Sequence, residues 1–464
     1  MMNLTNLFDI GKSALSAAQR RTMVTGHNIA NVNTPGYSRQ EPILQENRPL
    51  NDQPGQVGSG VQVAEIRQQV DRVVEDSLLR SGSALGTFDA ARGWLLRVQD
   101  SMGTSGEQGL GATINEFFQA WQDVSTNPAD LTTRTVLLSR ATSLAQLFNR
   151  TTADLDRQRQ GIDAEVGQTI ADSNALSVKI ADLNQEISLA ESRGQQANDL
   201  RDQRRQLLGA LSEQIEISTI EDSTGQVTVF VGKGHQLVER GRAYQLVGVP
   251  DSGNSGLLDV RYNGGGGASV DLTSSTGGGR LKAILDVRDQ QIPTAQGSLD
   301  SLAAAMVAGI NLQHRSGFGL DGSTGQDFFL AGGVTARTMA VALTDGRTVA
   351  ASSTAAGVPG NNANAIAVSA LQSQTVASLG GLNFNQYFNS IVTTIGTKTQ
   401  AAQRDFDAQE IIHEHLEARR AEISGVSVDE ELVQMMQSQR AFQAASRVII
   451  VADEMLQTLL TLKR

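Results

Sequence analysis

The two ends of this 464-residue chain carry similar apolar stripes, and that similarity limits how the chain can fold. At each end, apolar or small residues recur in steps of about three, four or seven, which is the spacing of a narrow heptad-like stripe on a helix. A lone helix with so narrow a stripe is marginal in water, so each end needs a partner. The first stripe is Leu4, Phe8, Gly11, Leu15, Ala18, Thr22, Thr25, Ile29 and Val32, and the second is Val428, Leu432, Met435, Phe442, Ile449, Leu456 and Leu460.

Signals at the helix ends accompany both stripes. Pro35-Gly36 suits the central positions of a type II turn, so the first helix should stop near residues 31–33. Ser427 is placed to cap the last helix, with Glu430 three residues later as in a capping box. The neighbouring carboxylates of Asp429 and Glu431 would also complement the positive end of the helix dipole.

The middle of the chain predicts further helices and one β region. A second apolar seam begins at Leu176 and resumes at Leu200, with a turn expected at Gly194 between its two arms. Alternation around Val229 then indicates short antiparallel strands. We therefore expect an α+β multi-domain fold, mainly a long α-helical bundle or coiled coil built from both chain ends, with a small antiparallel β domain inserted in the middle. The expected segments are an N-terminal helix (1–35), an extended connector (36–75), a helical bundle with a long coiled-coil hairpin (76–215), a small β domain (216–277), a return helix of the bundle (278–316), a mixed β and loop segment (317–383), a bundle helix (384–423) and a C-terminal helix (424–464).

Composition narrows the possible functions. A net charge of −11 argues against nucleic-acid binding, which needs a basic surface. The chain has no cysteine, which excludes disulfides and thiolate chemistry, and only 4% aromatic residues. We expect no membrane insertion, because no run of about 18 apolar residues occurs. The first residues also lack the pattern of a cleaved signal peptide.

Two short motifs resemble metal sites only superficially. His413 and His415 are two positions apart, so on a helix their side chains point about 200° apart and do not readily share one metal. The segment 321–327 lacks the alternating ligands and closing glutamate of a calcium loop, and a tight turn before Phe328-Phe329 is favoured. We expect no cofactor, no metal and no catalytic residue.

The segment after the first stripe resembles the signature of the flagellar axial family of rod, hook and hook-associated proteins. The residues that carry this resemblance are Asn28, Asn31, Thr34, Pro35, Gly36 and Tyr37. Within that family, the following Ser38-Arg39-Gln40 and the blocks 198–204, 278–289 and 424–431 resemble the hook-associated protein 1 family. The last block includes Ser427, Asp429, Glu430 and Glu431. The β domains that this family commonly inserts after the position of Phe328-Phe329 are reduced here.

The resemblance implies a structural subunit at the junction between hook and filament. The terminal helices would be axial, line the inner tube of a self-assembled ring or tube, and stay disordered until assembly, as we expect for 1–35. Implied partners are the hook protein, the second junction protein (hook-associated protein 3) and a cytoplasmic flagellar export chaperone on the C-terminal helix. The protein would be exported without a cleaved signal peptide by the flagellar type III apparatus and act outside the cell.

Two alternatives remain at this point. A hook or distal-rod subunit would share the terminal helices but should lack the long seam from Leu176 to Ile215. An export-linked enzyme or adhesin would instead show saturable binding of a glycan, a peptide or a metal.

Overall fold

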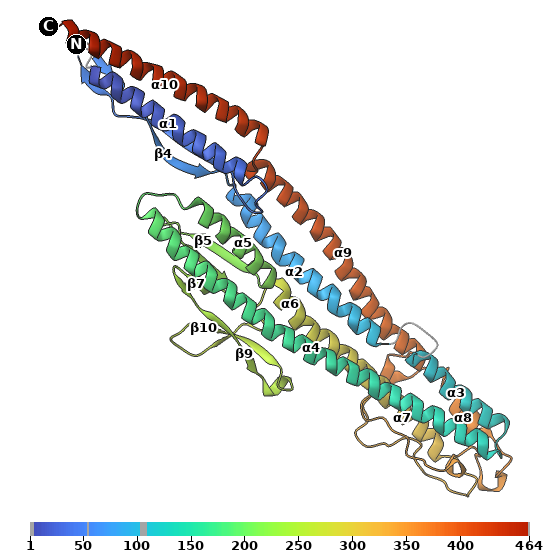
Figure 1. The fold of residues 1–464 in the computed structure, drawn as a ribbon. Coiled ribbons are helices and arrows are strands. Elements are labelled where there is room, and N and C mark those ends of the chain that lie inside the picture. Colours follow the sequence, from blue (N-terminus) through green and yellow to red (C-terminus); the bar gives the residue numbers. More distant parts are fainter. Residues whose placement is uncertain (1–3, 53–54, 103–108, 463–464) are drawn as a thin grey trace.

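The chain folds into an elongated molecule with two parts joined end to end (Figure 1). The computed structural model describes residues 4–52, 55–102 and 109–462. We call the described residues of 4–70 and 425–462 the shaft, and those of 71–424 the body. Both chain ends lie at the far tip of the shaft (Figure 1). The expected fold class is confirmed: long helices dominate, and a region of small antiparallel sheets lies in the middle of the chain, in addition to strands near its start.

The shaft is an antiparallel pair of helices with a β-hairpin along one side. Helix α1 (Leu4–Ala30) runs against α10 (Val428–Leu462), so that Gly11 faces Ile449 while Asn28 bonds Glu431. Strands β1 (Gln40–Glu46) and β4 (Val61–Gln68) pair antiparallel beside α1, with a bulge between Ile43 and Leu44. The small pair β2 (Leu50–Asp52) and β3 (Gly55–Val57) extends this hairpin.

The described residues of 36–75 thus form a folded-back hairpin followed by the first turn of a helix, which differs from the expected extended connector. The alternation of Val61, Val63 and the polar residues between them is the strand signal that the prediction missed.

Within the described residues, six long helices build the body: α2 (Arg72–Ser101), α3 (Leu110–Thr126), α4 (Leu131–Glu191), α5 (Asn198–Gln214), α7 (Ile292–Arg315) and α9 (Phe384–Ser424). Side-chain caps fix several starts, including Asp71 before α2, Asp130 before α4, and an Asn383–Gln386 capping box before α9. Gly194 has φ +77° between α4 and α5, which confirms the predicted turn of the hairpin.

Two small antiparallel sheets lie against α4. The first has the order β5 (Ile217–Glu221), β6 (Val227–Val231), β7 (His235–Glu239) and β8 (Arg242–Ala243). The second has the order β11 (Val270–Asp271), β10 (Leu258–Asn263) and β9 (Gln245–Pro250). Amide side chains of Asn174 and Asn184 on α4 bond the backbones of Leu246 and Val227, which fixes where both sheets sit.

The return to the helical bundle is made by α6 (Gly279–Asp286), a π-helical turn (Val287–Gln291) and α7. The segment 317–383 differs from its expected mixture of strands and loops. Its pairing is limited to isolated bridges such as Phe318 with Ser352, and it contains a short helix, α8 (Ala363–Ala370). Phe328 and Phe329 anchor this segment because both are fully buried in the core.

Candidate assembly interface

A row of small side chains lies between the two helices of the shaft. On α1, Gly11, Ala18 and Thr25 are buried, and they are seven residues apart. On α10, Ser438, Ala445 and Ala452 are buried with the same spacing. A Cβ added to Gly11 would lie 2.7 Å from Cγ1 of Ile449, so the helices approach closely at this point. We call these two rows the small-residue seam.

The larger residues of the predicted stripes flank this seam rather than fill it. Phe8, Leu15 and Ile29 on α1 are half-buried, as is Val32 in the turn beyond it, and so are Met435 and Ile449 on α10. Leu4 begins α1, but its side chain lies outside the described residues. The remaining stripe residues on α10 are exposed: Val428, Leu432, Phe442, Leu456 and Leu460.

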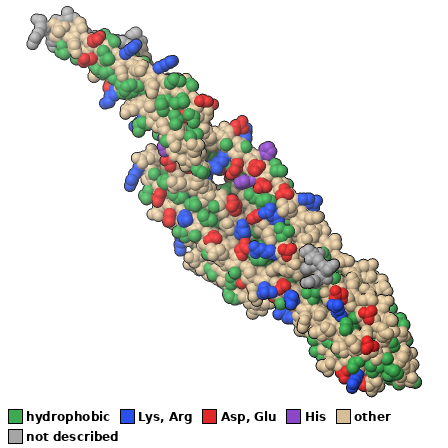
Figure 2. Space-filling model, turned by 45° about the vertical axis from the view of Figure 1, so that its right-hand side comes forward, with side chains coloured by type: hydrophobic (Ala, Val, Ile, Leu, Met, Phe, Trp, Pro, Cys, Tyr) green, Lys and Arg blue, Asp and Glu red, His purple; other side chains and the backbone are tan. Residues whose placement is uncertain are grey.

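Helix α10 therefore presents an unusual amount of apolar surface. Figure 2 shows apolar side chains gathered along the shaft. Of the described large apolar residues that are exposed, eleven lie on α10, and Leu460 reaches 62%. Exposed apolar surface on this scale is typical of an interaction site. The eleven are Val428, Leu432, Val433, Met436, Phe442, Ile450, Val451, Met455, Leu456, Leu459 and Leu460.

The base of the shaft is held by Asn28, which is only 1% exposed. Its amide nitrogen donates to the Gln40 carbonyl (2.9 Å) and to the Glu431 carboxylate (3.1 Å). Its amide oxygen accepts hydrogen bonds from the Tyr37 hydroxyl (2.7 Å) and the Gln40 backbone nitrogen (3.0 Å). One side chain thus connects α1, β1 and α10, since Glu431 lies in the first turn of α10.

The turn after α1 has the geometry that its sequence predicts. Gly36 has φ +74°, and the Tyr37 nitrogen donates to the Thr34 carbonyl at 3.2 Å, as in a type II turn around Pro35-Gly36. Asn31 shapes the exit from the helix, because its side chain donates to the His27 carbonyl and accepts from the Thr34 hydroxyl. The helix itself ends at Ala30, one residue before the predicted range.

The start of α10 is fixed by a cap and by Arg39. The Ser427 hydroxyl accepts a hydrogen bond from the Glu430 nitrogen at 3.5 Å. The Glu430 carboxylate pairs with Arg39 (3.1 Å), and Arg39 also bonds the buried Glu431 carboxylate at 2.8 Å. The third acid of this first turn, Asp429, is exposed. Because it is almost fully buried, Glu431 needs the charge of Arg39 beside it.

Hydrogen bonds between polar groups connect the shaft to the body. The Ser38 nitrogen donates to Asp202 on α5 at 3.0 Å, and Arg205 of the same helix donates to the Ser38 hydroxyl at 2.9 Å. Gln40 donates to Asp199 at 2.7 Å. We call this set of contacts the joint. Burial, followed by the charges of Asp199, Asp202 and Glu431, raises the pKa of the Tyr37 phenol, so Tyr37 stays a neutral donor to Asn28.

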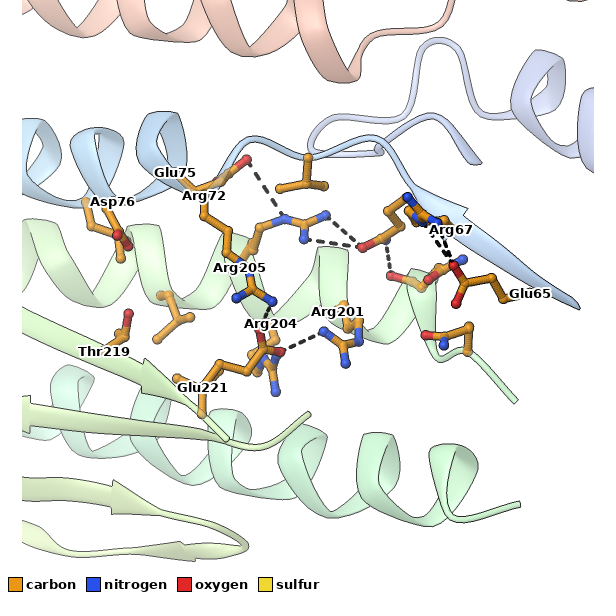
Figure 3. Close-up of a pocket in the computed structure, with 17 residues that line it drawn as sticks. Glu65, Arg67, Arg72, Glu75, Asp76, Arg201, Arg204, Arg205, Thr219 and Glu221 are labelled. Atoms are coloured by element: carbon orange, nitrogen blue, oxygen red, sulfur yellow. Dashed lines mark hydrogen bonds and ion pairs between the residues drawn. The ribbon is translucent and has the colours of Figure 1, made fainter. Parts of the chain in front are cut away.

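A cavity of about 580 Å³ lies beside the joint. Figure 3 shows charged side chains around it, with Arg204 and Arg201 directed toward Glu221 and Arg205 toward Glu75. Its shaft wall is Glu65, Arg67, Gln68 and Val70, and its body wall comes from the start of α2, from α5, and from β5 and β6. Ion pairs between these arginines and glutamates stabilise the walls of the cavity.

The two histidines of the segment 413–415 lie in different surroundings. His413 contacts the Ser81 hydroxyl at 3.2 Å, whereas His415 is exposed. Over the described ranges, no group of three or more His, Cys, Asp or Glu residues is placed to hold a metal ion. Within the same ranges, no helix combines the length and apolarity needed to cross a membrane.

Sequence reasoning missed the seam on α10 and most of the joint. Ser438, Ala445 and Ala452 repeat every seven residues, but small residues were not counted as a stripe there. The joint residues Ser38, Asp202 and Arg205 are polar, and polarity alone does not indicate a partner until the fold brings the residues together.

A family model of the flagellar hook-associated protein FlgK helical domain matches residues 95–329, half of the chain. The chain belongs to this family. Two further models match its ends: the flagellar basal body rod protein over residues 8–37, and the C-terminal part of the flagellar basal body rod FlgEFG proteins over 418–462. The family-specific match therefore lies in the body, whereas the shaft helices carry the pattern shared with rod proteins.

Whole-chain relatives agree with this family. Flagellar hook-associated protein 1 of Escherichia coli (strain K12) is 24% identical, and the match covers 99% of this chain and 100% of that protein. The protein of the same name in Bacillus subtilis (strain 168) is 25% identical, covering 97% and 96%. The flagellar hook junction protein FlgK from Burkholderia pseudomallei shares the fold, with a TM-score of 0.67, 16% identity, and coverage of 75% of this chain and 100% of that one. The chain is thus a structural component of the flagellar axis.

Proposed function

We propose that this chain forms the junction between the flagellar hook and filament, and that the exposed face of α10 assembles there. The main evidence for this proposal is the set of eleven exposed apolar side chains described on α10. They lie beside a seam that is already filled by small residues. Helix α1 cannot cover these side chains, because it already occupies the seam. Their natural partners are the terminal helices of neighbouring copies, in a ring or tube.

The energetics favour assembly. Burying one Leu or Phe side chain contributes about 1.5–3 kcal/mol. Each copy exposes several such side chains on α10, so contacts between copies can offset the ordering of the terminal helices. No catalytic step is part of this proposal, and no cofactor or metal is needed.

The partners follow from the position that we propose. The hook protein would contact the ring on one side and the second junction protein, hook-associated protein 3, on the other. The exposed stripe on α10 also favours a cytoplasmic export chaperone that covers the C-terminal helix before assembly. Export would use the flagellar type III apparatus, and the protein would act outside the cell. The Burkholderia pseudomallei protein that shares this fold is a flagellar hook junction protein, which supports the same position.

Phe442→Asp tests the assembly face. Phe442 is 40% exposed on α10, so a charge there should leave the body folded but prevent burial against a neighbouring copy. We expect a soluble protein with a normal melting temperature, loss of the protein from isolated flagella, and filament protein released unpolymerised into the medium.

Gln443→Asp is the matched control, because Gln443 is the next residue, is also exposed and gains the same charge. We expect this variant to assemble and to support filament growth. Normal filaments on cells that carry Phe442→Asp would refute the assembly face.

Deletion of 428–464 should reproduce the release of filament protein, and a deletion strain with normal filaments would refute the junction role itself.

A further inference from the structure

The apolar core of the molecule stops at the joint. Among the described residues, the core cluster runs from Ala90 to Ala402, and neither its members nor the partly buried residues packed on it belong to the shaft. The buried apolar residues of the shaft, such as Ala18 and Ala452, lie inside the shaft itself. The two described parts therefore do not share an apolar core that would fix one angle between them.

Within the described ranges, no helix crosses from one part to the other. Strand β4 ends at Gln68 and α2 begins at Arg72. Between α9 and α10 the helix is interrupted at Gly425, where a Cβ would lie 2.2 Å from the Ala421 carbonyl oxygen. The chain thus passes the joint through two short non-helical segments, and one of them depends on glycine.

Hydrogen bonds at the edge of the cavity hold the present angle. The Gln68 side chain donates to the Asn198 carbonyl at 2.5 Å, and the Asn198 side chain donates to the Ile66 carbonyl at 2.8 Å. Arg205 also donates to Gln68 at 3.3 Å. Bonds of this kind exchange with water at little net cost, unlike apolar packing.

The cavity leaves room for movement on one side of these bonds. The cavity of about 580 Å³ lies beside these bonds, between the end of β4, the start of α2, α5 and β5 (Figure 3). Charged side chains line it together with the apolar residues Val70, Leu79, Leu208 and Val227. The charged part of these walls can be hydrated, and no shaft residue belongs to the apolar core, so the space can narrow or widen without disrupting that core.

We propose that the joint is a hinge, at which the shaft tilts as one unit against the body by opening or closing this cavity. The bonds of Gln68 with Asn198 and Arg205 set the angle together with the joint contacts of Ser38 and Gln40, and the chain bends at Gly425. Copies that meet different neighbours along the flagellar axis could then keep the same shaft packing and body fold while they differ in angle. This inference goes beyond the junction role, because it holds wherever along the axis the chain assembles.

Electron cryo-microscopy of isolated flagellar axial structures, reconstructed without imposed symmetry, tests the hinge. We expect individual copies to differ in the angle between α9 and α10 and in the width of the cavity. When the shaft and the body are superposed separately, each should have the same structure in all copies. One angle shared by all copies would overturn the proposal, as would differences spread evenly through the body. If the protein were found elsewhere along the flagellar axis, the proposed junction function would be contradicted. The hinge would still be tested by the angles between shaft and body in those copies.

A pair of variants on β4 gives a second measurement. Gln68→Ala removes the bonds to Asn198 and Arg205, and we expect a wider spread of angles than in the wild type. Gln62→Ala makes the same change at an exposed position on the same strand and should leave the spread unchanged. An unchanged spread in Gln68→Ala would overturn the role of these bonds in the hinge.

Discussion

Asn28 shows how much one polar side chain can organise at the scale of a residue. Buried amide groups are costly unless their hydrogen-bonding capacity is used, and here both the nitrogen and the oxygen have two partners. Leucine would leave these partners unsatisfied, and aspartate would place a second carboxylate against Glu431. Position 28 therefore requires an amide side chain of the length of asparagine.

His314 in the body is a second buried polar residue, and it makes stability depend on pH. Its Nδ1 donates to the Gln326 carbonyl (2.7 Å) and its Nε2 accepts from the Ala350 nitrogen (2.9 Å), so the ring is neutral. Burial lowers the pKa of the imidazole. The unfolded chain therefore takes up the proton first as pH falls below about 6.5, and the folded state loses up to about 1.4 kcal/mol per pH unit from there downward.

We expect the melting temperature of the wild type to fall between pH 7 and pH 5, and His314→Gln to show a smaller fall from a lower starting value. Tryptophan fluorescence follows this transition, because the centroids of the Trp121 ring and the imidazole lie 6.2 Å apart. His415→Gln, at an exposed position, should keep the wild-type pH dependence. An identical pH dependence in His314→Gln and wild type would contradict this role of the buried imidazole.

At the scale of elements, the apolar spacing predicted both terminal helices but not which face of each meets the other. Residues such as Phe442 and Ile449 recur every seven positions, and so do Ser438 and Ala445, four positions earlier. A stripe of large residues indicates burial, but it does not say whether the partner belongs to the same chain. The close approach at Gly11 decides this in favour of the small-residue seam within the chain.

Substitutions at two glycines on α1 can distinguish the effect of helix propensity on stability from the effect of packing between the helices. Gly11→Ala and Gly26→Ala should each favour the helix by about 1 kcal/mol. A Cβ at Gly26 has nothing within 4 Å, whereas at Gly11 it lies 2.7 Å from Ile449. We therefore expect isolated flagella that carry Gly26→Ala to release this protein at a higher temperature than wild type, and those with Gly11→Ala at a lower one. Equal shifts in the same direction would show that the seam does not set the distance between the helices.

At the scale of the whole molecule, sequence periodicity predicted the dominance of long helices and the small β region in the middle of the chain. It did not predict the shaft as a separate part. The contacts that define the joint, such as Ser38 with Asp202, connect residues far apart in the chain, and polar residues carry no periodic signal. The pattern of segment 317–383 misleads because Gly, Ser and Asn suit loops and strand ends alike, whereas its shape is set by burial of Phe328 and Phe329.

The order of the shaft before assembly is the remaining prediction at this scale. Helices α1 and α10 share a seam of small residues that buries little apolar area, and α10 leaves its larger side chains exposed. Because short seams of this kind stabilise isolated helices weakly, we expect backbone amides of residues 4–30 to exchange hydrogen rapidly in the monomer and slowly in isolated flagella. Amides of α4, which passes through the core, should be protected in both states and serve as the internal control. If residues 4–30 were as strongly protected in the monomer as α4, the gain of order on assembly would be disproved.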